Sequence, residues 1–220
     1  MFHFKDFINA LTVELKKGLP GWEAQKLMSA RGREKLSESF INAKNPRKSA
    51  VLVWLYPQDN SIFTRLILRT QYEGVHSGQV SFPGGAWEET DADLWQTALR
   101  EAKEEVGLLP ERVTLVGELS SLYIPPSNFW VHPFVGASDA IIPPVIDTKE
   151  VQRIIDTNIF TLLEPDIKEE KIIFNSKSSA SWRTEQFQKT PYYNIQGYTV
   201  WGATAMILSE LEELMRRIKN

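Results

Sequence analysis

Apolar residues recur at helical spacing near both ends of the chain. From Phe4 to Leu15 they stand three or four positions apart, which predicts an amphipathic helix that stops at Leu19-Pro20-Gly21. A second short helix is predicted over residues 22–30. Residues 202–219 carry a single apolar stripe, which predicts a long C-terminal helix. The stripe consists of Ala205, Leu208, Leu211, Met215 and Ile218.

Between these helices the apolar positions form short runs rich in β-branched and aromatic residues, as is typical of strands. Runs at residues 50–57 and 63–70 flank Gln58-Asp59-Asn60-Ser61, a composition that predicts a hairpin. The other runs predicted as strands are 112–119, 128–137, 170–174 and the aromatic stretch around 192–201. Because these strands do not alternate strictly with helices, we expect an α/β or α+β fold, with helices packed on a mixed sheet.

Polar residues dominate between the second helix and the first strand. This segment, residues 31–48, includes Asn45-Pro46 and predicts a linker. We therefore divide the chain into an N-terminal helical extension and linker over residues 1–48 and a main domain over residues 49–220.

Composition and charge exclude several classes of protein. The 25 Lys and Arg residues stand against 28 Asp and Glu residues, a formal net charge of −3, so no overall basic field attracts nucleic acid or an anionic membrane. No apolar run approaches the ~20 residues of a membrane helix. The chain has no Cys, which excludes a disulfide scaffold and Cys-ligated zinc. We expect a cytoplasmic protein that binds neither nucleic acid nor membranes, and the sequence leaves monomer and homodimer both open.

A segment rich in acidic residues carries the candidate chemistry. Leu94, Ala98, Ala102 and Val106 repeat every four residues, which predicts a helix over about residues 93–106 with its apolar stripe on the sheet. Gly107 follows at the position where a left-handed glycine ends a helix.

Three carboxylates, Glu101, Glu104 and Glu105, share one side of the last turns of this helix. The helix dipole disfavours acids there by ~0.3–1 kcal/mol each, so the three side chains need another explanation. One explanation is a solvated acidic face, in which Arg100 and Lys103 relieve the repulsion between the acids. The other is a site for Mg²⁺ or Mn²⁺, because the chain has no Cys or paired His and Pro83-Gly84-Gly85 lets backbone oxygens approach a ligand. Such ions activate water for attack on phosphate anhydrides.

These residues resemble the box of the Nudix hydrolase family, which is a glycine, five residues, a glutamate, seven residues and then Arg-Glu-apolar-any-Glu-Glu-any-Gly-apolar. The stretch from Arg100 to Leu108 fits the second half residue for residue. The first half departs from the family pattern, because Gly85 plus five residues reaches Asp91 rather than Glu and eight residues precede Arg100.

An upstream block is similar to the signature of the coenzyme A pyrophosphatase branch of that family, Leu-Leu-Thr-x-Arg followed by His-x-Gly-Gln-x-x-Phe-Pro-Gly-Gly. Here it reads Leu66-Ile67-Leu68-Arg69 and His76-Ser77-Gly78-Gln79-Val80-Ser81-Phe82-Pro83-Gly84-Gly85. Leu68 replaces the Thr, and a basic residue often found in the spacer is absent. Further similar blocks are residues 124–129, 131–136, 150–151 and 201–204, so the resemblance spans roughly residues 49–210.

The resemblance implies a Nudix-type mixed sheet between helices and a divalent-metal site that uses Mg²⁺ or Mn²⁺. Glu101, Glu104 and Glu105 would ligate the metal, one of them acting instead as the base that activates water. Gly85 would offer its carbonyl oxygen, and Arg100 would orient the carboxylates. The substrate contacts that the resemblance implies are Arg69, His76, Ser77, Gln79 and Phe82.

Several side chains have two interpretations. Arg69 is either a phosphate clamp, which we expect to contact the 3′-phosphate of coenzyme A, or an ion-pair partner. Glu150 either supplies a distal carboxylate or begins a helix over residues 151–158, the interpretation that we favour. His76 is expected to hold its loop rather than to ligate metal, and His132 to be a core residue with its hydrogen bonds satisfied.

The resemblance therefore implies a pyrophosphatase that converts coenzyme A or acyl-CoA into 3′,5′-ADP and 4′-phosphopantetheine or its acyl form. The alternatives are the same chemistry on ADP-ribose, NADH or a dinucleoside polyphosphate, and a binding module of this fold without catalysis.

Overall fold

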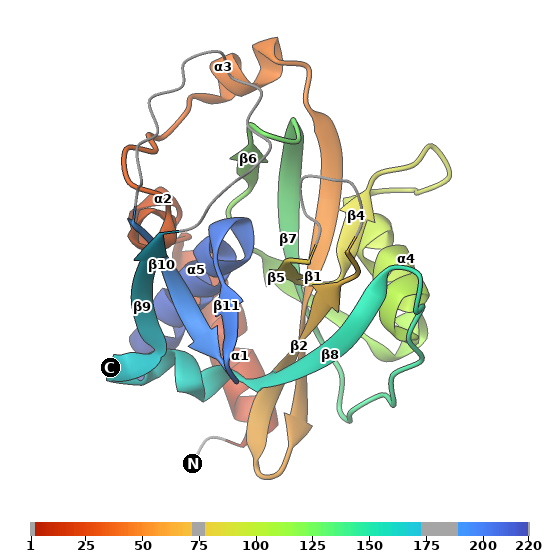
Figure 1. Ribbon diagram of the computed structural model, residues 1–220. Helices are drawn as coiled ribbons and strands as arrows, with labels where there is room; N and C mark the ends of the chain where they lie inside the picture. Colours follow the sequence, from red (N-terminus) through yellow and green to blue (C-terminus); the bar gives the residue numbers. More distant parts are fainter. Residues whose placement is uncertain (1–2, 72–77, 173–188, 220) are drawn as a thin grey trace.

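The computed structural model describes residues 3–71, 78–172 and 189–219 (Figure 1). Its N-terminal elements are the helices α1 (Phe4–Lys17) and α2 (Trp22–Gln25), the 3₁₀ turn η1 (Lys26–Met28), and the helix α3 (Glu38–Ala43). Helix α1 confirms the first predicted helix, and α2 together with η1 confirms the second. Helix α3 lies in the segment predicted as a linker. The Ser37 side chain caps this helix by accepting a hydrogen bond from Phe40 N.

The central element is an eight-stranded mixed sheet. Its strands are β1 (Arg47–Gln58), β2 (Ser61–Arg69), β3 (Val80–Ser81), β4 (Gly84–Ala86), β5 (Thr114–Glu118), β6 (Leu122–Ile124), β7 (Phe129–Ala137) and β8 (Val151–Asn158). The main path runs β3-β2-β1-β7-β5, while β4 pairs with β1, β6 with β7 and β8 with β2. Strands β1 and β7 are parallel and the other pairs are antiparallel, which confirms the predicted mixed sheet.

Helices lie on both sides of this sheet. Helix α4 (Leu94–Val106) lies on one side, while α1, α2, the long helix α5 (Gly202–Lys219) and a second, three-stranded sheet lie on the other (Figure 1). The small sheet consists of β9 (Lys168–Ile172), β10 (Lys189–Ile195) and β11 (Tyr198–Val200). Three further 3₁₀ turns are η2 (Pro110–Arg112), η3 (Ile159–Leu163) and η4 (Pro165–Ile167). In the described ranges, none of the helices is long and apolar enough to cross a membrane.

Strand β1 is buried on both faces, which explains why its sequence is a continuous apolar run. Leu52 and Trp54 pack into the cluster under α4, whereas Val53 and Leu55 pack into the cluster under α1 and α5. The predicted hairpin to β2 is confirmed. Its two-residue loop, Asp59-Asn60, has φ values of 50° and 57°, the left-handed conformation that two-residue hairpin loops favour.

The N-terminal helices share a core with the rest of the chain. Phe7 and Leu11 of α1 are buried in the same cluster as Leu208 and Leu211 of α5. The fully buried carboxylate of Glu210 on α5 fixes the start of α2 as well. It accepts hydrogen bonds from Gly21 N at 3.0 Å, Gln25 Nε2 at 3.0 Å, Ser120 N at 3.1 Å and Ser120 Oγ at 2.6 Å.

Two expectations are wrong, one about residues 151–158 and one about His132. Residues 151–158 form strand β8 rather than a helix, because Val151, Ile155 and Thr157 are buried along an antiparallel pairing with β2. Asp156 of this strand forms an ion pair with the buried side chain of Arg65 at 2.7 Å. His132 is half-buried, and its Nε2 atom has no hydrogen-bond partner among the described residues, so it is not the satisfied core histidine that we expected.

Candidate active site

Helix α4 begins and ends where the sequence predicts. The Asp93 side chain accepts a hydrogen bond from Gln96 N at 2.8 Å, and Gly107 ends the helix with φ of 70°. Ala98, Ala102 and Val106 are buried against β1. Because that stripe fixes the rotation of the helix, the acidic residues of its last turns are directed to the edge of β1 and the loop before the helix.

The glycines of that loop make room for a close approach. Strand β4 pairs with β1 through Ala50 opposite Gly85, and Pro83 O accepts a hydrogen bond from Leu52 N at 2.9 Å. A Cβ atom on Gly84 would collide with Ala50 O, and one on Gly85 would collide with the carboxylate of Glu101. The backbone at Gly85 thus lies directly against a carboxylate of α4.

Glu105 is the most buried of the three acids of α4, with a side chain that is 2% exposed. Its Oε1 accepts a hydrogen bond from Arg69 Nη1 at 2.8 Å, and its Oε2 accepts one from Gly84 N at 2.9 Å. Burial raises the pKa of Glu105 to about 7, and the negative charges of Glu101 and Glu150 act in the same direction. A carboxyl group with this pKa exchanges protons near neutral pH.

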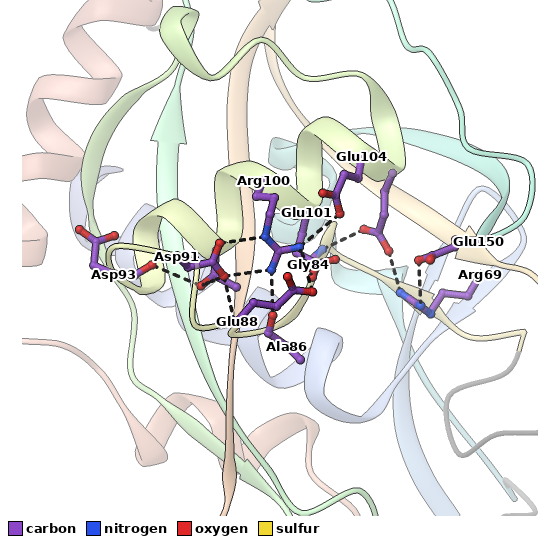
Figure 2. A network of polar contacts seen from close by, with 12 residues as sticks. Arg69, Gly84, Ala86, Glu88, Asp91, Asp93, Arg100, Glu101, Glu104 and Glu150 are labelled. Atoms are coloured by element: carbon purple, nitrogen blue, oxygen red, sulfur yellow. Dashed lines mark hydrogen bonds and ion pairs between the residues drawn. The ribbon is translucent and has the colours of Figure 1, made fainter.

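Arg100 connects the loop to the other two acids (Figure 2). Its Nε and Nη2 donate to the two carboxylate oxygens of Asp91 at 2.8 and 3.0 Å, and Nη1 donates to Glu101 at 2.9 Å and Glu104 at 3.2 Å. The guanidinium lowers the pKa of Asp91 to about 2. Asp91 also accepts from Thr97 Oγ1 at 2.9 Å. Asp91, which departs from the family pattern, therefore anchors the arginine.

The three acids differ in exposure. The side chain of Glu104 is 58% exposed, whereas that of Glu101 is 15% exposed. Burial and the nearby charges of Glu104 and Glu150 raise the pKa of Glu101. The acids thus lie at the helix end as predicted, and the solvated-face interpretation fits only Glu104.

Arg69 lies at the end of β2 and faces the acids. Its Nη2 atom is 3.8 Å from Glu150 Oε2, in addition to the shorter contact of Nη1 with Glu105. Glu150 directly precedes β8, and its backbone oxygen accepts a hydrogen bond from Thr70 N at 2.9 Å. Arg69 thus contacts two carboxylates and also lines the cavity described below. The same contacts bring Glu150 to the site, although the sequence favoured a structural role for it.

A cavity of about 570 Å³ extends from the carboxylates along the sheet. Its acidic end includes Gly85, Glu101 and Glu150, and Gln79 and Phe82 lie in its wall. Apolar side chains form much of the remaining lining, among them Val51, Ile124, Phe129, Val131, Trp201 and Ile207. Two of the predicted substrate contacts, His76 and Ser77, lie outside the described residues.

Comparison with known proteins identifies the family. Residues 46–177 match the NUDIX domain family over more than half of the chain. The chain belongs to the Nudix hydrolase family. It is accordingly a hydrolase of pyrophosphate bonds, as the sequence predicts.

Relatives of this Nudix hydrolase extend the match beyond the family domain. Proteins named "Uncharacterized Nudix hydrolase NudL" from Klebsiella pneumoniae and Cronobacter sakazakii are 35% identical over 176 residues and 34% identical over 185 residues. These alignments cover 77% and 81% of this chain, and 83% and 86% of those proteins. The crystal structure of RenU, a Nudix hydrolase from M. smegmatis, covers 79% of this chain and 88% of its own, with 13% identity and a TM-score of 0.53. That likeness confirms the fold.

The acidic end of the cavity in this Nudix hydrolase has the donor chemistry of a Mg²⁺ or Mn²⁺ site. Carboxylate and carbonyl oxygens are the ligands that these ions prefer. Burial raises the pKa values of Glu101 and Glu105, and neighbouring acids act in the same direction, so a cation would be a favourable partner for these carboxylates. Among the described residues, no three His, Asp or Glu side chains already stand together as a metal cluster. Instead, the acids are turned toward Arg100 and Arg69.

Sequence reasoning on this Nudix hydrolase misjudged one charged residue at the cavity and missed another. Glu150 was considered as a distal carboxylate but assigned to a helix start, although residues 151–158 hold four β-branched side chains that favour a strand. Arg33, which lines the cavity from the N-terminal extension, gives no such signal. It lies in a polar segment whose pattern predicts no element.

Proposed function

We propose that this Nudix hydrolase is a Mg²⁺- or Mn²⁺-dependent pyrophosphatase that converts coenzyme A or acyl-CoA into 3′,5′-ADP and 4′-phosphopantetheine or its acyl form. The observation that supports it best is the lining of the cavity. It combines the carboxylates of Glu101 and Glu150 with many apolar side chains, so a substrate cleaved at Glu101 could place a long arm against apolar residues.

Glu101, Glu104 and the carbonyl oxygen of Gly85 are the groups that would hold the cation, and Glu105 would join them if it does not act as the base. When bound, it neutralises phosphoryl oxygens and lowers the pKa of a coordinated water. Glu105 is the best candidate among the acids for the base that takes the proton of the attacking water, since its carboxyl has a pKa of about 7 and is held at both oxygens. Arg100 orients Glu101 and Glu104.

Other residues of the proposed site bind the substrate. Gln79 and Phe82 lie in the cavity wall close in sequence to the glycine loop, and they would contact the part of the substrate nearest the anhydride. Arg69 acts through Glu105, whose orientation it fixes. We retain His76 and Ser77 as substrate contacts on the strength of the sequence block alone.

A small substrate panel tests this proposal. Purified protein is incubated with coenzyme A, ADP-ribose, NADH and a diadenosine polyphosphate, each with Mg²⁺ or Mn²⁺, and products are separated by chromatography. We expect the highest kcat/KM on coenzyme A, with 3′,5′-ADP as one product. A clear preference for ADP-ribose, NADH or the diadenosine polyphosphate would make that compound the substrate instead of coenzyme A. If none of the compounds is hydrolysed, a binding module without catalysis would be favoured.

A further inference from the structure

A positively charged side chain lines the cavity beside strand β6, which β7 and β1 separate from the glycine strand β4. Arg33 lies in the segment between η1 and α3, outside the residues that match the family domain. Its Nη2 donates to the backbone oxygen of Tyr123 at 2.6 Å, and its Nη1 contacts Met206 Sδ at 3.3 Å. These contacts hold the guanidinium at the cavity wall beside Ile124 and Ile207.

Among the described residues, no carboxylate neutralises the charge of Arg33. In the part of the chain that the structure describes, no carboxylate lies within 4.0 Å of this half-buried guanidinium. The half-buried or buried arginines Arg65, Arg69 and Arg100 each contact a carboxylate at 2.7 or 2.8 Å. Placing a charge in a partly desolvated position without such a partner is unfavourable, and burial lowers the pKa of Arg33. An anionic ligand would supply the missing partner.

The lining of the cavity therefore carries charges of both signs. Glu101 and Glu150 are its acidic residues, and Arg69 is engaged by Glu105. Arg33 is the second basic residue of the lining, and the contacts above leave N–H groups of its guanidinium for a ligand. Ser127 also lines the cavity, and its hydroxyl has no hydrogen-bond partner among the described residues.

We infer that Arg33 binds a phosphomonoester of the substrate, so that the enzyme acts on nucleoside diphosphate derivatives that carry an additional phosphate on the ribose. The guanidinium fork matches phosphate oxygens, which it contacts through paired, charge-assisted hydrogen bonds. The inference rests on the proposed function in that it concerns a substrate of the same cavity. It also gives to Arg33 the phosphate contact that the clamp interpretation of Arg69 would place on that residue.

A binding measurement tests the role of Arg33 without turnover. Adenosine 3′,5′-bisphosphate, adenosine 2′,5′-bisphosphate and 5′-AMP are titrated into the protein by isothermal calorimetry. We expect at least one bisphosphate to bind about tenfold to hundredfold more tightly than 5′-AMP, the range of a charge-assisted contact. Arg33→Met, which keeps an unbranched apolar stem, should abolish this preference, and Arg33→Lys should retain part of it.

Arg31→Met is the matched control. Arg31 is an exposed neighbour that pairs with Glu170 at 3.3 Å and does not line this cavity, so its variant should keep the full preference. Equal binding of 5′-AMP and both bisphosphates by the unmodified protein would overturn the inference. So would a preference that survives in Arg33→Met. Melting curves of both variants verify that they are folded.

Kinetics separate this inference from the proposed function. Coenzyme A is compared with 3′-dephospho-coenzyme A, and NADPH with NADH. In Arg33→Met we expect KM to rise about tenfold to hundredfold for the phosphorylated member of the preferred pair, with kcat unchanged. Equal losses on both members would show that Arg33 is only structural. If the unmodified protein hydrolyses none of the four, the proposed function fails, and the titration still decides the role of Arg33.

Discussion

Arg69 Nη1 lies 2.8 Å from Glu105 Oε1, although the two residues belong to a strand end and a helix end that are 36 positions apart in the chain. The second oxygen of Glu105 is held by the backbone N–H of Gly84. Strand β2, the glycine loop and helix α4 are thus joined at one carboxylate. Replacements around this carboxylate should therefore alter activity more than stability.

Glu105→Gln keeps the shape of the side chain and removes its charge. Turnover should fall by orders of magnitude, because an amide cannot take a proton from water. The fold should remain intact, since the amide oxygen can still accept a hydrogen bond from Gly84 N and the like charges of Glu101 and Glu150 lose a neighbour. Steady-state kinetics and a melting curve measure both effects. A mild kinetic effect would mean that Glu105 is no part of the catalytic machinery.

Arg69→Ala should lower kcat/KM for coenzyme A and for 3′-dephospho-coenzyme A by the same factor. The reason is that the guanidinium faces Glu105 and Glu150. Arg69→Lys, which keeps the charge without the fork, should recover part of the activity. A loss confined to coenzyme A would instead place Arg69 on the 3′-phosphate.

Removal of divalent metal should abolish hydrolysis, and its return should restore it. Mg²⁺ or Mn²⁺ should also raise the melting temperature, because an ion that binds only the native state stabilises it. In Glu101→Gln this thermal shift should shrink, since one proposed ligand has lost its charge. Activity that persists after exhaustive chelation would refute the metal mechanism.

Asp91 should make stability depend on pH in the acid range. Its pKa is lowered to about 2 in the folded protein by Arg100, so its stabilisation is complete above its unfolded pKa near 4 and is lost as pH falls through 2. A shift of this size corresponds to about 2 kcal/mol. Urea unfolding between pH 2 and 7 should show this acid-side loss in the unmodified protein. In Asp91→Asn it should be smaller, with lower stability at pH 7.

Glu210→Ala should lower the free energy of unfolding by about 2–4 kcal/mol, because it leaves buried donors at Gly21 and Ser120 without an acceptor. Glu213→Ala on the same helix is the control. The side chain of Glu213 is 43% exposed and lies 3.7 Å from Arg217, so its removal should change stability by less than about 0.5 kcal/mol. Similar losses for the two variants in urea unfolding would argue against the buried carboxylate as an anchor.

Local pattern was enough to predict the hairpin of β1 and β2 and both ends of α4, because turn chemistry and apolar spacing act over a few residues. The strand β8 was mistaken for a helix because its stability comes from pairing with β2, a contact between distant segments. The roles of Asp91 and Arg69 were uncertain for a related reason. Which carboxylate an arginine meets depends on how β2, the loop and α4 are assembled.

The core that α1 shares with α5 bears on where this protein can be shortened. The family match ends at residue 177 and begins at residue 46, so a fragment with these limits would lack both helices. It would expose Val53 and Leu55 of the central strand to water and would remove Trp201, Ile207 and Arg33 from the cavity wall. The smallest unit that can fold with a complete cavity therefore extends beyond the family domain on both sides.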